Sequence, residues 1–144
     1  MNELYTTDNF SNQEIMDIYK LKNIAVVGMS PTNGKPSNYV PKFLIEKGYN
    51  VIPVNPNYPS ILNKKSYDKV SDISENIDIV NIFRKSEEVL SVIKDSLDKK
   101  GIKVIWMQKG IYNREGEKLA SNKGIKVLYN RCMLEEHKRL FKEF

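Results

Sequence analysis

Short apolar runs alternate along the chain with longer segments in which apolar residues recur every three or four positions. The short runs are typical of strands buried on both faces, and the longer pattern is typical of amphipathic helices. The predicted strands cover residues 24–28, 49–54, 78–83, 103–107 and 125–128. Because helices separate the strands, we expect βαβ units with right-handed crossovers. The predicted fold class is α/β, a doubly wound, parallel five-stranded sheet in a Rossmann-like, three-layer αβα domain.

The predicted helices lie between and around these strands. They cover residues 12–20, a segment that begins at Ser37 or nearer Pro41 and ends at Gly48, a segment from a cap at Ser86 to Gly101, residues 113–123 and residues 133–144. Ser11 and Glu14 form a capping box at the start of the first helix. Pro41 is tolerated only in a first turn, which limits where the second helix begins. Residues 61–70 are predicted to be irregular, with a short helical turn at residues 70–74.

Length and composition favour one domain and exclude several classes of protein. The 144 residues contain no linker or repeat, so residues 1–144 are expected to form one unit, with residues 1–20 as a helical extension packed on it. No apolar run is long enough to span a membrane, and residues 1–10 lack a secretory signal. The single cysteine suits a reducing compartment, so a cytoplasmic protein is expected. One histidine and one cysteine, without carboxylates in register, predict no zinc site.

The net charge of +5 does not indicate a nucleic-acid-binding protein. Most lysines and arginines alternate with acids on helical patterns, which is typical of solvated faces. The sequence shows neither a long block of like charge nor a recognition helix. A nucleic-acid-binding module is therefore the weakest of the functional interpretations.

The first strand and the loop after it predict an anion site. The apolar run stops at Gly28, a loop with Gly34 follows, and a helix then begins. Free backbone N–H groups and the positive end of the dipole at a helix N-terminus favour phosphate. Only Gly28 lies in the turn, so the G-x-G-x-x-G fingerprint of dinucleotide-binding proteins is absent.

The segments that directly follow the five predicted strands are polar or basic and contain no acid. They carry Ser30, Asn33, Lys35 and Ser37, then Asn55 and Asn57, then Arg84 and Lys85, then Gln108 and Lys109, and finally Asn130 and Arg131. In open parallel sheets, ligands bind beyond the carboxyl ends of the strands. Several cations at one edge repel each other, so this edge is interpreted as a pocket for a polyanion. The alternative is that short loops are polar and that lysines lie there by chance in a basic protein.

The residue at the end of the second strand distinguishes among nucleotides. NAD-binding proteins place a carboxylate there to bind the ribose hydroxyls, whereas this chain has Asn55 followed by Pro56. A carboxylate would repel a ribose phosphate and a neutral amide does not. The sequence therefore favours coenzyme A (CoA), with its 3′-phosphate, or NADP.

Several motifs, in order, resemble one known family. They are VVGMSP at residues 26–31, KPS at 35–37, VIPVNP at 51–56, IFR at 82–84, VIWMQ at 104–108 with Gly110, and NRCM at 130–133 with His137. Together these motifs resemble the small single-domain CoA-binding proteins, which are similar to the CoA-binding Rossmann-like domain of the succinyl-CoA synthetase α subunit. The resemblance covers about residues 21–140 and implies CoA or an acyl-CoA as the ligand.

The resemblance also implies a role for each loop. The first loop would wrap the phosphates, with Lys35 as the cation; residues 54–56 would line the adenosine side, and residues 108–111 would lie near pantetheine. The implied ligand-binding residues are Gly28, Met29, Ser30, Lys35, Pro36, Ser37, Val54, Asn55, Pro56, Phe83, Arg84, Gln108, Gly110, Asn130 and Arg131. The 144 residues contain no second domain, phosphohistidine segment or ATP-grasp region, which argues against ligase activity.

No residues converge on a catalytic site in the sequence. His137 lies five residues after Cys132, about 140° around a helix, so the two side chains are not expected to meet. We expect His137 and Trp106 to be packed, and Cys132 to be a small buried residue rather than a thiol poised for disulfide exchange with CoA. The leading hypothesis is a CoA-binding protein without catalytic machinery, as a homo-oligomer or with a protein partner. The alternative is an NADP-dependent oxidoreductase or redox sensor.

Overall fold

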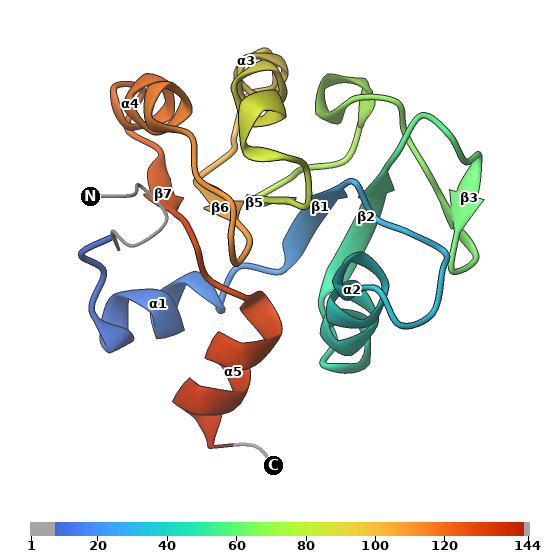
Figure 1. Cartoon of the computed structure of the whole chain (residues 1–144), viewed down its shortest axis with the longest axis horizontal. Coiled ribbons are helices and arrows are strands. Elements are labelled where there is room, and N and C mark those ends of the chain that lie inside the picture. Colours follow the sequence, from blue (N-terminus) through green and yellow to red (C-terminus); the bar gives the residue numbers. More distant parts are fainter. Residues whose placement is uncertain (1–7, 143–144) are drawn as a thin grey trace.

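The computed structural model describes residues 8–142 and contains a five-stranded, all-parallel sheet between two helical layers (Figure 1). The strands are β1 (Asn23–Val27), β2 (Asn50–Val54), β5 (Ile79–Ile82), β6 (Val104–Met107) and β7 (Lys126–Leu128). Their spatial order is β2-β1-β5-β6-β7, so strand order reverses between β1 and β5. The predicted fold class is confirmed, and every strand boundary agrees with the prediction to within one residue. The reversal is the point at which open sheets bind ligands.

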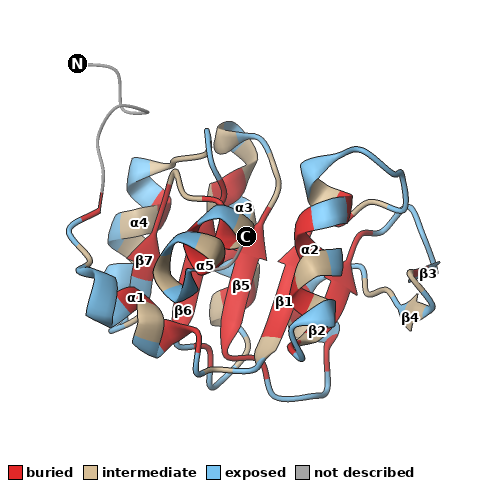
Figure 2. Cartoon of the chain, turned by 90° about the horizontal axis from the view of Figure 1, so that it is seen from below, coloured by how far each residue is buried: buried red, intermediate tan, exposed pale blue. Residues whose placement is uncertain are grey.

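Helices cover both faces of the sheet. One face carries α1 (Asn12–Ile18), α2 (Pro36–Glu46) and α5 (Met133–Phe141), and the other carries α3 (Val89–Leu97) and α4 (Arg114–Ser121), with the 3₁₀ segments η2 (Val70–Asp72) and η3 (Ser86–Glu88) (Figure 1). Successive side chains of β1 alternate between the two layers: Ile24 and Val26 belong to the α2/α5 core, and Ala25 and Val27 to the α3/α4 core. Because residues 24–27 of β1 are buried on both faces (Figure 2), their sequence is an unbroken run of apolar residues.

The first helix begins as the sequence predicts. Ser11 Oγ accepts a hydrogen bond from the Glu14 N–H, and the Glu14 carboxylate accepts one from the Ser11 N–H, which completes the capping box. Ile15 and Ile18 are buried in the α2/α5 core. No helix within residues 8–142 is long and apolar enough to cross a lipid bilayer.

Helix α2 contains a proline that the sequence interpretation misplaced. The predicted start at Ser37 or Pro41 is wrong, because Lys35 is the N-cap and Pro36 the first helical residue. Pro41 therefore lies inside the helix, where its missing N–H leaves the Ser37 carbonyl without its usual donor. The N–H of Ser30 donates to that carbonyl at 3.0 Å. The internal proline thus ties the loop after β1 to α2.

Two further local predictions are wrong. Residues 61–70 are not wholly irregular, since β3 (Ser60–Ile61) and β4 (Lys64–Lys65) form an antiparallel hairpin. The two residues between them, 62 and 63, both have positive φ, as a two-residue hairpin turn requires. Ser86 does not cap a long helix: it lies in η3, and its Oγ accepts a hydrogen bond from the Tyr112 N–H at 3.1 Å. The last two residues of the predicted helix 133–144 lie outside the described residues.

Candidate functional site

A pocket of about 390 Å³ opens at the carboxyl ends of β5 and β6, between the N-termini of α2 and α5. It is lined by Lys35, Pro36, Ser37, Tyr39, Phe83, Gln108, Lys109, Ile111, Cys132 and Glu135. Two helix N-termini therefore border one hollow, an arrangement in which backbone N–H groups and aligned dipoles favour a phosphate. The structure brings five of the predicted ligand-binding residues together here: Lys35, Pro36, Ser37, Phe83 and Gln108.

Lys35 provides an uncompensated cation at this pocket. Its side chain is exposed at the N-cap of α2 and makes no capping hydrogen bond. No carboxylate in the described part of the chain forms an ion pair with it. The ammonium group is therefore available to an anionic ligand.

Gln108 shapes the opposite wall of the pocket. Its side chain is buried, and Oε1 accepts a hydrogen bond from the Met133 N–H at 3.0 Å. This bond caps α5, because Cys132 at the N-cap position makes no side-chain cap of its own. The Gln108 side chain therefore holds the N-terminus of α5 against β6.

Other predicted residues lie beneath the loops rather than at the pocket surface. Gly28 has φ +84°, and a Cβ there would lie 2.6 Å from the Phe83 carbonyl oxygen, so the close approach of β1 and β5 requires glycine. Met29 is fully buried, and its carbonyl accepts a hydrogen bond from Asn55 Nδ2 at 2.9 Å. Asn55 Oδ1 in turn accepts from the Asn57 N–H at 3.0 Å. The Asn55 amide therefore joins the loops that follow β1 and β2.

A second hollow, of about 460 Å³, lies on the α3 side of the same sheet edge. It is lined by Val27, Val54, Asp68, Lys69, Val70, Ser91, Val92, Lys94, Asp95 and Asp98. Three carboxylates make it a poorer phosphate site than the α2/α5 pocket. Asp95 also has a structural role, because its carboxylate accepts a hydrogen bond from the Val70 N–H at 2.9 Å. Of the predicted ligand-binding residues, Val54 lines this hollow and Pro56 is exposed outside both.

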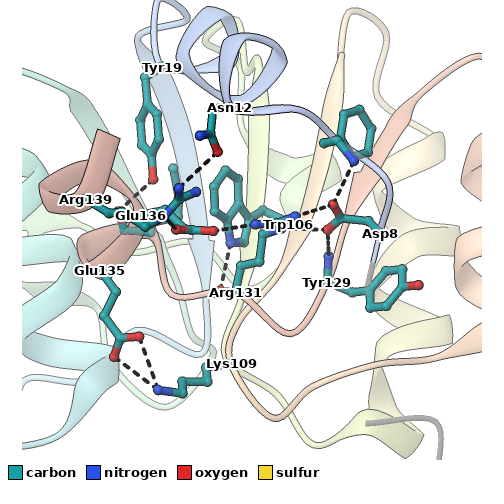
Figure 3. Close-up of polar contacts among 12 residues, drawn as sticks. Asp8, Asn12, Tyr19, Trp106, Lys109, Tyr129, Arg131, Glu135, Glu136 and Arg139 are labelled. Atoms are coloured by element: carbon teal, nitrogen blue, oxygen red, sulfur yellow. Dashed lines mark hydrogen bonds and ion pairs between the residues drawn. The ribbon is translucent and has the colours of Figure 1, made fainter. Parts of the chain in front are cut away.

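Arg131 is turned into a carboxylate network (Figure 3). Its Nε and Nη2 donate to the two carboxylate oxygens of Asp8 at 2.9 and 2.7 Å, and its Nη1 donates to Glu136. Hydrogen bonds to Asp8 and Glu136 raise the pKa of Arg131, although burial opposes them. Glu136 also accepts from Arg139 at 2.7 Å. Arg131 therefore holds the N-terminal segment against α5.

Two more cations of the edge are also paired. Arg84 Nε lies 2.8 Å from a carboxylate oxygen of Glu88. Figure 3 shows the second pair, in which Lys109 Nζ lies 3.2 Å from a carboxylate oxygen of Glu135. The inference that these cations lack compensating charge is wrong, because each pairs with an acid of a helical segment: Glu88 lies in η3 and Glu135 in the first turn of α5. The segments directly after the strands contain no acid, but the folded edge does.

The turns after β6 and β7 are joined by the remaining predicted residues. Asn130 has φ +54°, and its Oδ1 accepts a hydrogen bond from the Gly110 N–H at 2.7 Å.

Tyr39 and Glu135 line the pocket but were not predicted. Placing the start of α2 too late hid Tyr39, since a helix that begins at Pro36 brings Tyr39 into the first turn.

Trp106 and His137 are both packed in the core, as the sequence predicts. Trp106 is fully buried and its indole N–H donates to the Arg131 carbonyl at 2.9 Å. The His137 ring lies 5.0 Å from the Tyr19 ring and 4.6 Å from the Phe141 ring, centroid to centroid, which confirms the prediction of a packed histidine. Within residues 8–142, no cluster of His, Cys, Asp and Glu side chains is suited to hold a metal ion.

The fold is a Rossmann-like domain, and the N-termini of α2 and α5 border a pocket at the carboxyl edge of its sheet. The sequence matches the family model of the CoA binding domain over residues 22–138, and the chain belongs to this family. The Bacillus subtilis protein YneT is 36% identical over 130 residues, which cover 90% of this chain and 96% of YneT. A solved structure of a Pyrococcus horikoshii protein has a TM-score of 0.90 and 39% identity, covering 98% of this chain and 99% of that one.

Larger enzymes contain a similar region. The acetate–CoA ligase (ADP-forming) II of Archaeoglobus fulgidus is 31% identical over 133 residues. The match covers 91% of this chain but 19% of the ligase. The present sequence therefore matches only about a fifth of the chain that carries the activity named for that enzyme.

Proposed function

We propose that the protein binds CoA or an acyl-CoA at the carboxyl edge of its sheet, without catalytic machinery of its own. The observation that carries the proposal is the pocket where the N-termini of α2 and α5 and the unpaired Lys35 meet, in a chain of the CoA binding domain family. Phosphate is the ligand chemistry that two helix N-termini and a free ammonium group favour.

The proposed ligand lies across three loops. Its phosphates contact the loop from Gly28 to Ser37 and Lys35, its adenosine extends toward Val54 and Pro56, and its pantetheine arm passes Phe83. The neutral Asn55 at the end of β2 supports a ligand with a phosphorylated ribose, since no carboxylate at that residue repels it. The apolar Phe83 and Ile111 in the pocket wall support an uncharged arm.

The absence of catalysis is proposed from the placement of the histidine. Histidine is the side chain that most often performs general acid–base chemistry, and it must lie within hydrogen-bond reach of the reacting atoms. His137, the one histidine of the sequence, lies among aromatic rings of the core rather than in the pocket wall. The proposed role is therefore to hold, store or sense CoA, or to act through a partner.

Thermal unfolding with a ligand panel tests the proposal. The panel is CoA, 3′-dephospho-CoA, NADP and NAD, each added to the whole chain. A ligand at 100 times its Kd stabilises the folded state by about 2.7 kcal/mol, which raises the Tm of a domain of this size by roughly 5–10 °C. We expect the largest shift with CoA and a smaller one without the 3′-phosphate. A larger shift with NADP favours the alternative, an NADP-dependent oxidoreductase or redox sensor, and no shift with any ligand overturns the proposal.

A further inference from the structure

One buried amide in the central strand has no hydrogen-bond partner among the described residues. Asn81 in β5 is fully buried, and neither its Oδ1 nor its Nδ2 is bonded to any group within residues 8–142. The other buried amides near the sheet edge are bonded: Asn38 Nδ2 donates to the Ser30 carbonyl at 2.9 Å, and Asn55 and Gln108 make the bonds described above. An unpaired buried amide is destabilising, so its presence requires an explanation.

The sheet register places Asn81 directly beneath the α2/α5 pocket. Its cross-strand neighbours are Val26 and Trp106, both of which belong to the core on the α2/α5 face. Because side chains alternate along a strand, the next residues on the same face toward the carboxyl edge are Phe83 and Gln108. Both of these line the pocket. Asn81 therefore lies one row of side chains below the pocket wall.

We propose that Asn81 is a specificity-determining residue, the polar floor that recognises the amide-bearing pantetheine arm of the ligand. This inference rests on the proposed function. Of the two side chains above Asn81, Gln108 is fixed by the Met133 N–H, whereas the half-buried ring of Phe83 is held by packing alone. Rotation of Phe83 on ligand binding opens the way to Asn81.

The chemistry of the site selects the arm rather than the phosphates. A primary amide offers both a donor and an acceptor, which match the N–H and C=O groups of an amide in the ligand. A phosphate at this depth would be a buried charge, and the row around Asn81 holds the apolar Val26 and Trp106 instead of a cation. The unpaired Asn81 amide therefore has a neutral polar group as its best partner.

The test uses the single tryptophan of the sequence as a probe. Trp106 lies beside Asn81, so its fluorescence responds to a group that reaches Asn81. The whole protein is titrated with CoA and with adenosine 3′,5′-bisphosphate, a nucleotide without the pantetheine arm. We expect CoA to change the Trp106 emission and the bisphosphate to leave it unchanged. An equal change with both nucleotides overturns the inference.

Variants separate a ligand contact from a structural role. In Asn81→Leu, CoA binding is expected to weaken about tenfold, the worth of a lost hydrogen bond, with bisphosphate binding unchanged. The Tm of the free variant should not fall, because the unpaired amide is gone. Ile79→Val, on the same strand face but farther from the pocket, is the matched control and should lower the Tm without changing CoA affinity. If the Asn81→Leu variant does not fold, the Asn81→Val variant is used in its place.

The outcomes distinguish the two proposals. Unchanged CoA affinity in Asn81→Leu overturns the role of Asn81 while leaving CoA binding intact. An equal loss of affinity for CoA and for the bisphosphate also overturns it, since the residue then acts through the fold. Failure of the wild-type protein to bind CoA overturns the proposed function, and the role of Asn81 with it.

Discussion

Two parts of the sheet edge, the Lys35 corner at the start of α2 and the Arg131 corner at the start of α5, are alike in sequence because each has a basic residue before a helix. They differ in the folded protein. In each, a basic residue precedes a helix that borders the same pocket: Lys35 before α2 and Arg131 before α5. Lys35 is exposed and has no carboxylate partner in the described residues. Arg131 has a side chain only 19% exposed, and it pairs with Asp8 and Glu136.

The difference shows that a basic residue at the carboxyl edge of the sheet serves one of two purposes. A cation whose bonds are all made within the protein stabilises the fold and has little to offer a ligand. A cation without a partner adds repulsion to the free protein that an anion relieves. The two corners therefore predict opposite phenotypes, which the following substitutions test.

The largest effect is expected at the Arg131 corner. Arg131→Ala leaves the Asp8 carboxylate, 3% exposed, without its bidentate partner, and breaking such a buried pair costs about 3–5 kcal/mol. Urea unfolding at neutral pH measures the loss. Lys35→Ala is the matched control, and its stability should stay within about 0.5 kcal/mol of the wild type. Similar stabilities of the two variants would abolish the distinction between the corners.

The Lys35 corner depends on the turn that begins it. Gly28→Ala forces a Cβ to 2.6 Å from the Phe83 carbonyl oxygen at φ +84°, so we expect a loss of about 2–4 kcal/mol. Gly34 has a similar φ of +91°, but a Cβ there meets nothing within 4 Å. Gly34→Ala therefore isolates the conformational cost, about 1–2 kcal/mol. Equal losses in the two variants would mean that β1 and β5 separate freely at this point.

These two corners also show what the sequence can and cannot predict. The strands were placed correctly because each is an apolar run buried on both faces, a local property of the sequence. The partner of Arg131 could not be placed, because Asp8 lies 123 residues away along the chain. The start of α2 was wrong because the Ser30 N–H replaces the donor that Pro41 lacks, a contact between separate elements. Lys35 and Ser37 were predicted because they lie between the first apolar run and the helical pattern that follows it, which is also a local property of the sequence.

Ligand affinity should show the reverse order of the two corners. Lys35→Ala is expected to weaken CoA binding by about 1–3 kcal/mol, since a charge-assisted hydrogen bond to phosphate is lost. Lys109→Ala is the control in the same pocket, and it should have a smaller effect because Lys109 already pairs with Glu135. Arg84→Ala should likewise have the smaller effect, because Arg84 pairs with Glu88. Isothermal titration with CoA decides the order, and equal losses in all three variants would contradict it.

The smallest effect is a pH dependence at the Arg131 corner. Burial raises the pKa of Glu136, but hydrogen bonds from Arg139 and Arg131 outweigh burial and leave the pKa below its usual value. Because the folded pKa is depressed, the stabilisation is present above the unfolded pKa of about 4.5 and is lost as pH falls through the folded value. Urea unfolding of wild type and Glu136→Gln between pH 7 and pH 3 measures the difference.

Glu136→Gln should be less stable than wild type at neutral pH, and the two curves should converge in acid, where the wild-type carboxyl is also neutral. The other carboxylates titrate in both proteins and cancel in the comparison, so convergence reports on Glu136 alone. Parallel curves would mean that Arg131 gains nothing from the charge of Glu136. Asp8 would then hold the corner by itself, and CoA affinity should be the same in both proteins because Glu136 does not line the pocket.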